Sequence, residues 1–566
     1  MSTASAKSFY EDKAVILEGL YNYWEELGKN NSFFRKLARL HTWVGSTDHK
    51  RIGILYLISM LTFFAVGVSL GFTIRLEWFY PGEQFINARV YNSVFTLHGI
   101  IMIFLFVIPG IPAIFGNFFL PIVIGAADVS FPRLNLASWY MFMTGAFLAA
   151  ISLFVGSTGD GSLTFVAPDG GWTFYAPYSL QSNSNVGLAV FAAFILGFSS
   201  IFTGLNFITT IHRMRVEGMG WYDMPLFVWG LYATSWIQVL ATPVIGITLA
   251  LIGIERLFGV GIFDAAMGGD PVLYQHMFWI YSHPAVYVMV IPGMGVVSEI
   301  IAVFSQRTIF GYKSMVFSMM GIAFVGYFVW AHHMFTSGMT ETSMIVFSFL
   351  TFFVAVPTAV KVFNWLATLY KGSIQLDPPM IWALSFVFLF SIGGFTGLAL
   401  GMINIDIAVH DTLYVVGHFH YTMFGGGAVS LFAGLHYWYP KMFGRMYNFF
   451  YAYVGWALFF VGFNTLYGSM LVAGIMGMPR RYHDYLPEFT TIHQIGTVGS
   501  VIMIFGLIIV FGNLFISLFS GKKAEDNPWM GKTLEWDQAS TPPVLFNFKK
   551  QPRINHGPYD YEGEWV

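Results

Sequence analysis

The residues best able to do chemistry in this chain are histidines that lie inside long apolar runs. They are His98, His283, the adjacent pair His332 and His333, and the pair His418 and His420. Hydrocarbon tolerates an unpaired imidazole poorly, so a histidine inside a membrane segment indicates a functional site by default. Bound metal ions satisfy all six imidazoles at once.

The pair His332 and His333 predicts a metal held by three imidazoles. Adjacent side chains point about 100° apart on a helix. Both rings therefore reach one metal only where it lies beside the helix with a third ligand opposite. His283, on another apolar run, supplies that ligand, and three imidazoles suit copper or zinc. Tyr287 follows His283 by four residues and shares its helix face, where a phenol can donate a proton and an electron.

The pair His418 and His420 predicts two further metals beside one helix. Residues two apart face nearly opposite sides of a helix, so this helix can ligate two different irons. His98, on an early run, completes a six-coordinate haem with one of them. Ligation by two histidines saturates an iron and suits electron transfer, whereas an open sixth position suits oxygen chemistry.

Composition places these histidines in a membrane protein. The chain has 566 residues, of which 56% are hydrophobic and 10% charged, and its mean hydropathy is +0.63. Soluble domains carry about 25% charged residues. We therefore predict an all-α polytopic membrane protein, with twelve transmembrane helices enclosing two haems and one copper. The predicted spans are 52–74, 90–120, 134–156, 186–211, 226–254, 272–304, 312–337, 342–370, 379–402, 412–438, 447–474 and 489–520.

The net charge of -2 and the absence of cysteine bound the function further. Neither suggests a nucleic-acid partner, and without cysteine the chain holds no disulfide, iron–sulfur cluster or thiolate-bound copper. We predict an N-terminal segment at 1–48, one helical domain at 49–520 and a C-terminal tail at 521–566, with a short amphipathic surface helix at 16–26. Lysine and arginine gather in one set of alternating loops, which places both termini in the cytoplasm.

The opposite set of loops carries few basic residues, yet Arg480 and Arg481 are adjacent there. Such a pair indicates a fixed anionic ligand such as haem propionates. The alternative is a plain pair of interfacial arginines whose charged ends reach toward water.

From about residue 43 to 520 the chain resembles subunit I of haem–copper terminal oxidases. The motifs that carry the resemblance are Thr96-Leu97-His98-Gly99, Asp270-Pro271 through Tyr287, His332-His333, Val356-Pro357-Thr358 with Lys361, His410-Asp411-Thr412, Gly417-His418-Phe419-His420-Tyr421 and Met478-Pro479-Arg480-Arg481.

The resemblance implies a role for each matched residue. It implies His98 and His420 on the low-spin haem iron, His418 on the high-spin haem iron, His283, His332 and His333 on Cu-B, Tyr287 cross-linked to a Cu-B histidine, Arg480, Arg481 and Trp172 near the haem propionates, Arg75 near a ring substituent of the low-spin haem, His410 and Asp411 on magnesium, and Glu77 in a sodium or calcium site.

The resemblance also implies two proton routes from the cytoplasmic side. The first runs through Lys361 and Thr358 towards Tyr287. The second begins at Asp128 and continues along Asn117, Asn135, Ser199 and Ser200. Many relatives end this second route with a glutamate two residues after the first Cu-B histidine, and here that position is Ala285. We expect Tyr281 and Ser282, which precede that histidine, to bridge water instead.

By this resemblance the chain is the catalytic subunit of a proton-pumping cytochrome c oxidase in a bacterial inner membrane. Haem A is the expected haem. The expected partners are a subunit II carrying Cu-A, a membrane subunit like subunit III, cytochrome c, O2 and a respiratory supercomplex. The alternatives are a quinol oxidase, which shares these ligands, a nitric oxide reductase, which Tyr287 and Lys361 argue against, and a transporter whose histidines relay protons.

Overall fold

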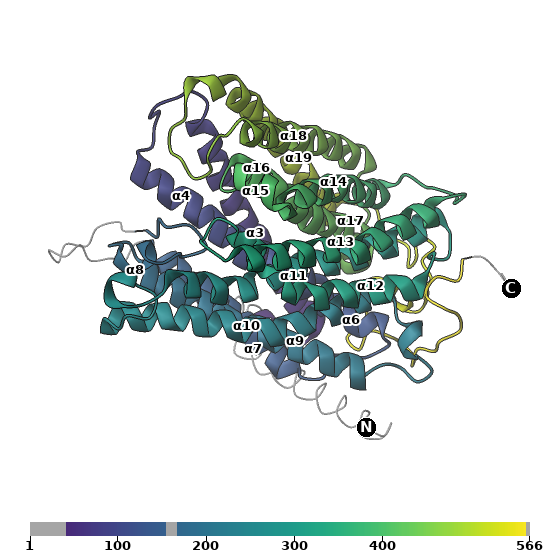
Figure 1. Cartoon of the computed structure of the whole chain (residues 1–566). Coiled ribbons are helices and arrows are strands. Elements are labelled where there is room, and N and C mark those ends of the chain that lie inside the picture. The colour runs from purple at the N-terminus through teal and green to yellow at the C-terminus, as the bar shows by residue number, and fades with distance from the viewer. Residues whose placement is uncertain (1–40, 154–166, 562–566) are drawn as a thin grey trace, which may run out of the picture.

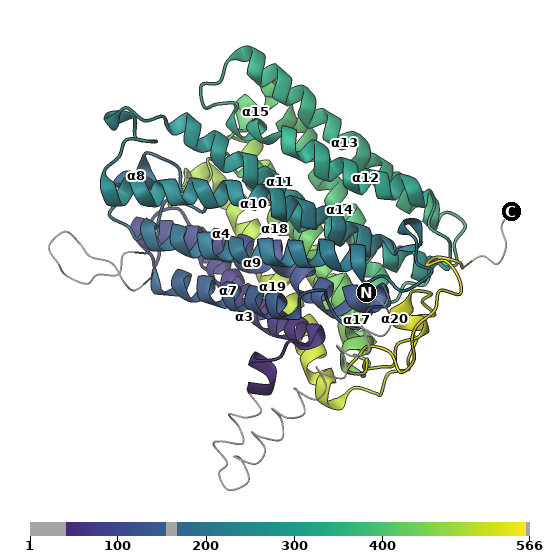
Figure 2. The ribbon, with the colours of Figure 1, turned by 90° about the horizontal axis from the view of Figure 1, so that it is seen from below.

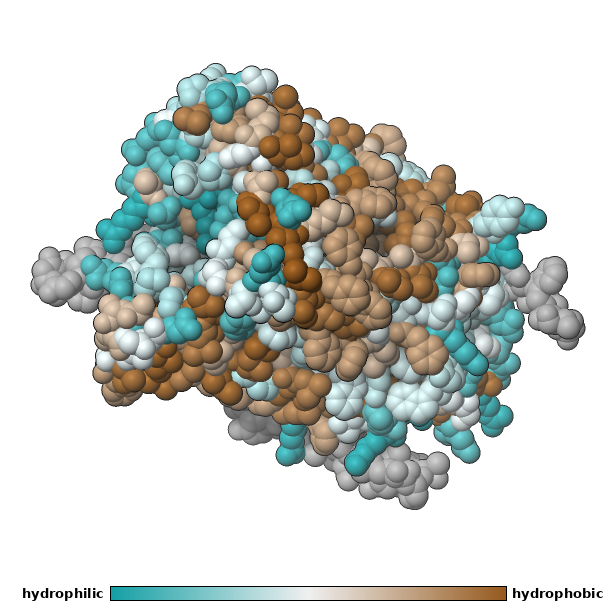
Figure 3. All heavy atoms as spheres, in the orientation of Figure 1, coloured by the Kyte–Doolittle hydropathy of each residue, from teal (hydrophilic) through white to brown (hydrophobic). Residues whose placement is uncertain are grey.

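The computed structural model describes residues 41–153 and 167–561, so the predicted surface helix at 16–26 lies outside the described residues. The described part is built of helices, with isolated β-bridges rather than strands. The helices run side by side between two ends of the molecule (Figures 1 and 2). Apolar side chains cover much of the surface between those two ends, and hydrophilic residues gather at the ends themselves (Figure 3).

Ten helical stretches in the described residues are long and apolar enough to cross a membrane, and each matches one of the predicted spans. They are α3 (His49–Glu77), α4 to α6 (Ala88–Val123), α7 (Pro132–Ile151), α9 (Val186–Arg213), α10 (Leu226–Phe258), α11 (Pro271–Ser305), α13 (Glu341–Leu369), α14 (Pro378–Gly401), α18 (Phe449–Ile475) and η8 with α19 (Pro487–Ser520).

The other two predicted spans are helical but divided into pieces too short to be counted as membrane helices, so ten of the twelve predicted helices are found as long apolar stretches among the described residues. One of the ten, Ala88–Val123, itself contains two π-helical segments, η1 (Ile101–Val107) and η2 (Pro112–Gly116). The span predicted at 312–337 is α12 (Tyr312–Val325) followed by two short 3-10 segments, η5 (Gly326–Phe328) and η6 (Trp330–Met334). The span at 412–438 is α16 (Leu413–Phe419), a π-helical segment η7 (His420–Ala428) and α17 (Val429–Phe443). Both interruptions coincide with candidate metal ligands. Short 3-10 and π-helical stretches inside a helix are often found at functional sites.

Glycine sets how closely two long helices approach. A Cβ atom on Gly462 of α18 would lie 2.3 Å from the backbone nitrogen of Met503 on α19, and one on Gly506 would lie 2.4 Å from that of Phe459. The hydrophobic effect does not drive helices together inside a bilayer, because lipid tails are as apolar as the side chains. Membrane helices associate instead through close backbone packing of this kind. Helix α11 runs through the centre of the bundle against α10, α14 and α17, and its side chains are buried over most of its length.

The C-terminal tail lies across the end of the bundle opposite the short helix α8 (Tyr178–Gln181) (Figure 2). Its helix α20 (Leu534–Asp537) brings Glu535 and Trp536 against α17. Both side chains are 1% exposed. The tail is therefore packed into the protein and carries buried polar groups of its own.

Replacing Glu535 with glutamine is expected to stabilise the protein increasingly as the pH rises. One Glu535 oxygen accepts a hydrogen bond from Trp438 Nε1 at 3.4 Å, and the other has no partner among the described residues. Burial raises the pKa of Glu535 above its ordinary value. The native state therefore binds this proton more tightly than the unfolded state. The stability that the protonated Glu535 contributes is fully present below the unfolded pKa and is lost as the pH rises through the folded pKa.

Thermal unfolding midpoints of the wild type and Glu535→Gln, compared between roughly pH 5 and pH 9, test this expectation. The difference between the two midpoints should widen towards alkaline pH. A constant difference across that range would contradict a buried, proton-binding Glu535.

Candidate metal centres

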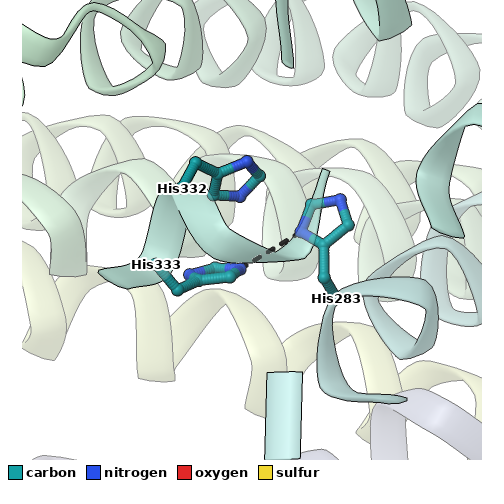
Figure 4. A group of neighbouring side chains, drawn as sticks. All are labelled: His283, His332 and His333. Carbon is teal, nitrogen blue, oxygen red and sulfur yellow. Dashed lines mark hydrogen bonds between the residues drawn. The ribbon is translucent and has the colours of Figure 1, made fainter. Parts of the chain in front are cut away.

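Three histidines from two elements meet in a compact group. His283 comes from the middle of α11, and His332 and His333 come from the 3-10 segment η6. One ring nitrogen from each lies within 4.8 Å of the others, and Figure 4 shows the three rings around a shared space. His283 Nδ1 and His333 Nε2 are 3.1 Å apart. Two ring nitrogens this close repel unless a proton or a metal lies between them, so the group fits a bound copper.

Neighbouring side chains hold these rings in place. The hydroxyl of Thr351 on α13 lies 2.9 Å from His332 Nδ1, which leaves the other nitrogen of that ring for a metal. The indole of Trp279 stacks on His333, with centroids 3.7 Å apart and planes 14° apart. Partners of this kind orient ligand rings and raise their basicity. Neither Thr351 nor Trp279 carried a signal in the sequence, because both contacts depend on packing between different helices.

Tyr287 reaches the same group from one turn further along α11. Its hydroxyl lies 2.9 Å from His283 Nε2, the nitrogen that faces away from His333. The phenol ring packs on Gly326, where an added Cβ would lie 2.6 Å from its Cδ2 and Cε2 atoms. The predicted shared face thus places a phenolic proton in direct contact with a candidate copper ligand.

His98 and His420 face each other across a gap the width of one metal ion. Their ring planes are 21° apart and their centroids 6.4 Å apart. Two imidazoles that bind one metal at about 2 Å each would place their centroids about 6 Å apart. Each Nδ1 lies 2.8 Å from a backbone carbonyl, that of Gly67 for His98 and that of Val416 for His420. Both Nε2 atoms are therefore the ones available, and the pair fits a haem iron with two axial histidines.

His418 points to a different side of its helix, as its spacing predicts. Its Nδ1 lies 3.0 Å from the carbonyl of Gly393 and 3.1 Å from the hydroxyl of Thr396, both on α14. These two contacts occupy Nδ1, so His418 is anchored to ligate a metal through Nε2.

Replacing Gly397 with alanine is expected to displace His418 and, if His418 ligates a haem iron, to lower the haem content of the protein. A Cβ at position 397 would lie 2.8 Å from His418 Cε1, closer than real Cβ contacts. Overpacking of this kind costs about 1–3 kcal/mol and moves the side chain. Gly394, on the same helix with no atom within 4 Å of its Cβ position, is the matched control. Pyridine haemochrome analysis of both purified variants measures the effect, and equal haem content in the two would contradict it.

The predicted outer residues gather near His98. The side chain of Arg481 packs on Gly171 beside Trp172, and the Trp172 indole packs on Gly99, next to His98. Burial lowers the pKa of Arg481 to about 10. Arg480 contacts Asp411 at 3.8 Å, and that carboxylate side chain is 72% exposed. Two neighbouring half-buried guanidinium groups with one exposed acid fit an added anionic group such as a pair of carboxylates.

The candidate magnesium residues include one that the sequence did not single out. His410 Nδ1 lies 2.9 Å from Asp406 Oδ2, and Asp411 lies 3.9 Å from the other ring nitrogen. Burial acts to lower the pKa of His410, but the Asp406 carboxylate outweighs it and the pKa is raised. Two carboxylates and an imidazole suit a hard or borderline divalent cation.

Arg75 and Glu77 end α3 in different surroundings. Arg75 is 3% exposed, and its Nη2 donates to the His493 carbonyl at 2.8 Å while its Nε has no partner among the described residues. This orphaned donor fits an added acceptor. Glu77 instead accepts from the backbone N–H groups of 84–86 and lies 3.1 Å from His483 Nε2. Donors surround its carboxylate, so its surroundings do not fit a sodium or calcium ion, which requires oxygen ligands.

The residues of the first predicted proton route lie along α13. Lys361 is 0% exposed, and its Nζ has no hydrogen-bond partner among the described residues. The amine lies 5.2 Å from the ring centroid of Trp365. Thr358, one turn earlier, donates to the carbonyl of Val354 at 3.0 Å. A buried amine without an anionic partner is costly, which makes it a functional rather than a structural group.

The residues of the second route separate into a mouth and a cavity. Asp128, Asn117 and Asn135 are buried, at the end of the bundle where the C-terminal tail lies. One cavity is lined by Ser199, Ser200 and Tyr281. The volume that the centre of a water molecule can occupy in it is about 40 Å³, so the cavity has room for water. Ser282 Oγ is buried without a partner among the described residues.

Tyr56 is a member of this cavity that the sequence analysis missed. Its hydroxyl lies 3.0 Å from Ser138 Oγ and 3.3 Å from Ser199 Oγ. It joins α3 to α7 and α9 at the cavity wall. A tyrosine in an apolar run gives no signal of its own, because aromatic residues fill helix interfaces throughout this chain.

Comparison with known proteins agrees with this arrangement. The family model described as cytochrome c and quinol oxidase polypeptide I matches residues 51–536. The cytochrome c oxidase subunit 1 of Synechocystis sp. is 43% identical over 515 residues, covering 91% of each chain. That of Cereibacter sphaeroides is 39% identical over 542 residues, covering 90% of this chain and 95% of the relative. A chain from the cryo-EM structure of a haem–copper terminal oxidase dimer shares the fold, with a TM-score of 0.67, 21% identity and 84% of each chain covered.

Proposed function

Since the chain belongs to the cytochrome c and quinol oxidase polypeptide I family, we propose that it is the catalytic subunit of a respiratory cytochrome c oxidase. It reduces O2 to water with electrons from cytochrome c and couples the reaction to proton translocation across the membrane. The observation that carries the proposal is the set of six histidines, which form one three-nitrogen group and two further ligand positions on neighbouring helices.

The proposed ligands divide among three metals. His98 and His420 hold the low-spin haem, His418 holds the high-spin haem, and the three-histidine group holds Cu-B. When bound, these groups transfer electrons and bind and reduce oxygen. The chain itself fixes the tautomer of four of the six rings, because a carbonyl or hydroxyl oxygen lies at Nδ1 of His98, His332, His418 and His420.

Tyr287 is the proposed proton donor at the copper site. Its hydroxyl touches His283 Nε2, so its proton moves within hydrogen-bond distance of the reacting centre. Lys361 and Thr358 supply replacement protons from the cytoplasmic side. Each electron that enters this apolar interior adds a negative charge, and an unpaired charge costs free energy in such surroundings. A proton that follows the electron neutralises the charge and removes that cost.

Asp128, Asn117, Asn135, Ser199 and Ser200 form the proposed second route. The cavity that contains the two serines also reaches Tyr281, which supports Tyr281 and Ser282 as the carriers that replace a glutamate at Ala285. Water held between hydroxyl groups passes protons without any of those groups being ionised.

Replacing Tyr281 with phenylalanine and Ser282 with alanine together is expected to slow proton delivery about tenfold or more, because the variant removes both hydroxyls but little volume. The pumped-proton ratio of reconstituted vesicles and the turnover rate measure the result. The single variant Tyr140→Phe, at an exposed tyrosine outside the cavity, is the control. A double variant that pumps and turns over like the wild type removes these two residues from the route.

The remaining assignments follow from the same family. We propose haem A at both haem positions, a magnesium at His410 and Asp411, twelve spans with both termini in the cytoplasm of a bacterial inner membrane, and the 1–48, 49–520 and 521–566 division. Arg75, Trp172, Arg480 and Arg481 contact the haems. A subunit II with Cu-A, a subunit like subunit III and a respiratory supercomplex are the proposed partners. We assign no sodium or calcium to Glu77, because N–H donors fill its surroundings.

The decisive experiment uses the purified complex with its partner subunits. We expect iron and copper in a two-to-one ratio for this subunit, a Soret band, and oxygen consumption with reduced cytochrome c. Oxidation of a quinol in place of cytochrome c would instead make the complex a quinol oxidase. A preparation without haem absorption would contradict the proposal altogether and favour a proton-relaying transporter.

A further inference from the structure

The C-terminal tail inserts one side chain between the start of α3 and the loop that carries Asp128. This side chain is Asn547, which is 0% exposed and has a φ of 70°. Its Nδ2 lies 2.8 Å from the carbonyl of Ala126, two residues before Asp128. Its Oδ1 lies 3.0 Å from Lys50 Nζ and 3.0 Å from His49 Nε2. A single buried amide thus joins the tail to two segments at the mouth of the proposed second route.

The contacts of Asn547 leave only one orientation for its amide. Lys50 Nζ can only donate, so the atom facing it must be the accepting oxygen. The carbonyl of Ala126 can only accept, so the atom facing it must be the donating nitrogen. Turning the amide over would set donor against donor and acceptor against acceptor at the same time.

This orientation fixes the protonation of His49. Its Nε2 faces the Asn547 oxygen, which can only accept, and its Nδ1 lies 2.7 Å from the carbonyl of Asn117, which also can only accept. A neutral imidazole has one N–H and would leave one acceptor facing a lone pair. Both contacts are satisfied only when both ring nitrogens carry hydrogen, which makes His49 an imidazolium.

We propose that His49 is a buried cation clamped by Asn547, and that this clamp makes the C-terminal tail part of the mouth of the Asp128 route. The ring is 0% exposed and bridges the tail to Asn117, another residue of that route. Lys50, the next residue of α3, pairs with Asp48 at 3.3 Å. The inference rests on the proposed function, because it assigns Asn547 as a positioning residue for that route.

The clamp is tested first in the purified complex by Asn547→Gly. Glycine keeps the positive φ without strain and removes every amide contact. We expect backbone hydrogen exchange at 124–131 and 543–552 to quicken about tenfold, the effect of losing a buried hydrogen-bonded anchor. Asn555→Gly makes the same change at an exposed residue of the tail and is the matched control. Unchanged exchange in Asn547→Gly, or equal changes in both variants, would overturn the clamp.

The charge on His49 is tested by His49→Gln and by a direct measurement. Glutamine offers a single donating nitrogen, so it matches a neutral histidine but not an imidazolium. We expect His49→Gln to quicken exchange in the same two segments. Solid-state NMR of the complex labelled at histidine ring nitrogens should show both His49 nitrogens protonated, with the signals identified by their loss in His49→Gln. One unprotonated nitrogen would overturn the assignment.

Proton uptake separates this inference from the proposed function. Asp128→Asn should slow uptake from the cytoplasmic side, and Asn547→Gly should slow it in the same direction by a smaller factor. If Asp128→Asn leaves uptake unchanged, the proposed route is wrong. If Asp128→Asn slows uptake and Asn547→Gly does not, the route stands and the inference about the tail is wrong.

Discussion

Replacing His333 with leucine is expected to remove copper from the complex and to lower oxygen consumption by more than about 1000-fold. His333 supplies one of three ring nitrogens that lie within 4.8 Å of one another. Two imidazoles cannot complete the three-nitrogen group, so the affinity for copper falls with the ligand. Leucine keeps an apolar side chain against Trp279, whose ring now stacks on His333 at 3.7 Å. The local packing should therefore survive while the chemistry does not.

Metal analysis and absorption spectra of the purified variant measure this effect. The low-spin haem should remain, because His98 and His420 lie in a separate pair. His276→Leu is the control, since this half-buried histidine accepts a hydrogen bond from Trp330 Nε1 at 3.3 Å and belongs to no metal group. A His333→Leu complex that keeps its copper and its activity would contradict the assignment of Cu-B.

Replacing Lys361 with methionine should move activity and stability in opposite directions. The amine is wholly buried, has no hydrogen-bond partner among the described residues and lies 5.2 Å from the ring centroid of Trp365. Methionine has a similar length without the polar group, so the change removes a desolvation cost and should raise the unfolding temperature or leave it unchanged. Turnover should fall about 100-fold or more, because the variant cannot carry a proton towards Tyr287.

Oxygen consumption and thermal unfolding of the same preparation measure both effects. Lys313→Met, at an exposed lysine near the ring of Tyr222, is the control and should change neither quantity greatly. A Lys361→Met enzyme that is less stable as well as inactive would instead make Lys361 a structural residue.

The sequence predicted the groups whose chemistry is unusual in hydrocarbon. The imidazoles of His98, His283 and His420 stand out because an apolar run gives them no other purpose, and their spacing already separated the ligand faces. The ten long apolar helical stretches were predictable because length and hydropathy determine them. The two spans that are divided at η5 with η6 and at η7 were predicted at the right places but without these breaks. Hydropathy does not register a π-helical or 3-10 turn.

The residues that support the ligands were not predictable from the sequence. Thr351, Trp279 and Tyr56 have ordinary residue types, and each acquires its role through a contact with another helix. Asp406 is different, because it pairs with His410 four residues later, a spacing that the sequence does show. Asn547 lies 498 positions from His49, a separation across which periodicity carries no information. The surroundings of Glu77, which do not fit the expected sodium or calcium ion, were not predictable for a related reason. The sequence shows a carboxylate but not the N–H groups that surround it.

The nine-residue π-helical segment that begins at His420 has a consequence for how this gene can change. A π turn contains an extra residue compared with an α turn, so losing one residue from 420–428 would restore ordinary winding. The helices on either side, α16 and α17, would keep their orientation, but the wide turn that carries the His420 side chain would be lost. Single-residue deletions there should therefore displace the His420 ring even where the lost residue is one of three consecutive glycines, while substitutions at the same glycines are limited only by the space around them. Insertions and deletions in aligned relatives should therefore avoid this stretch.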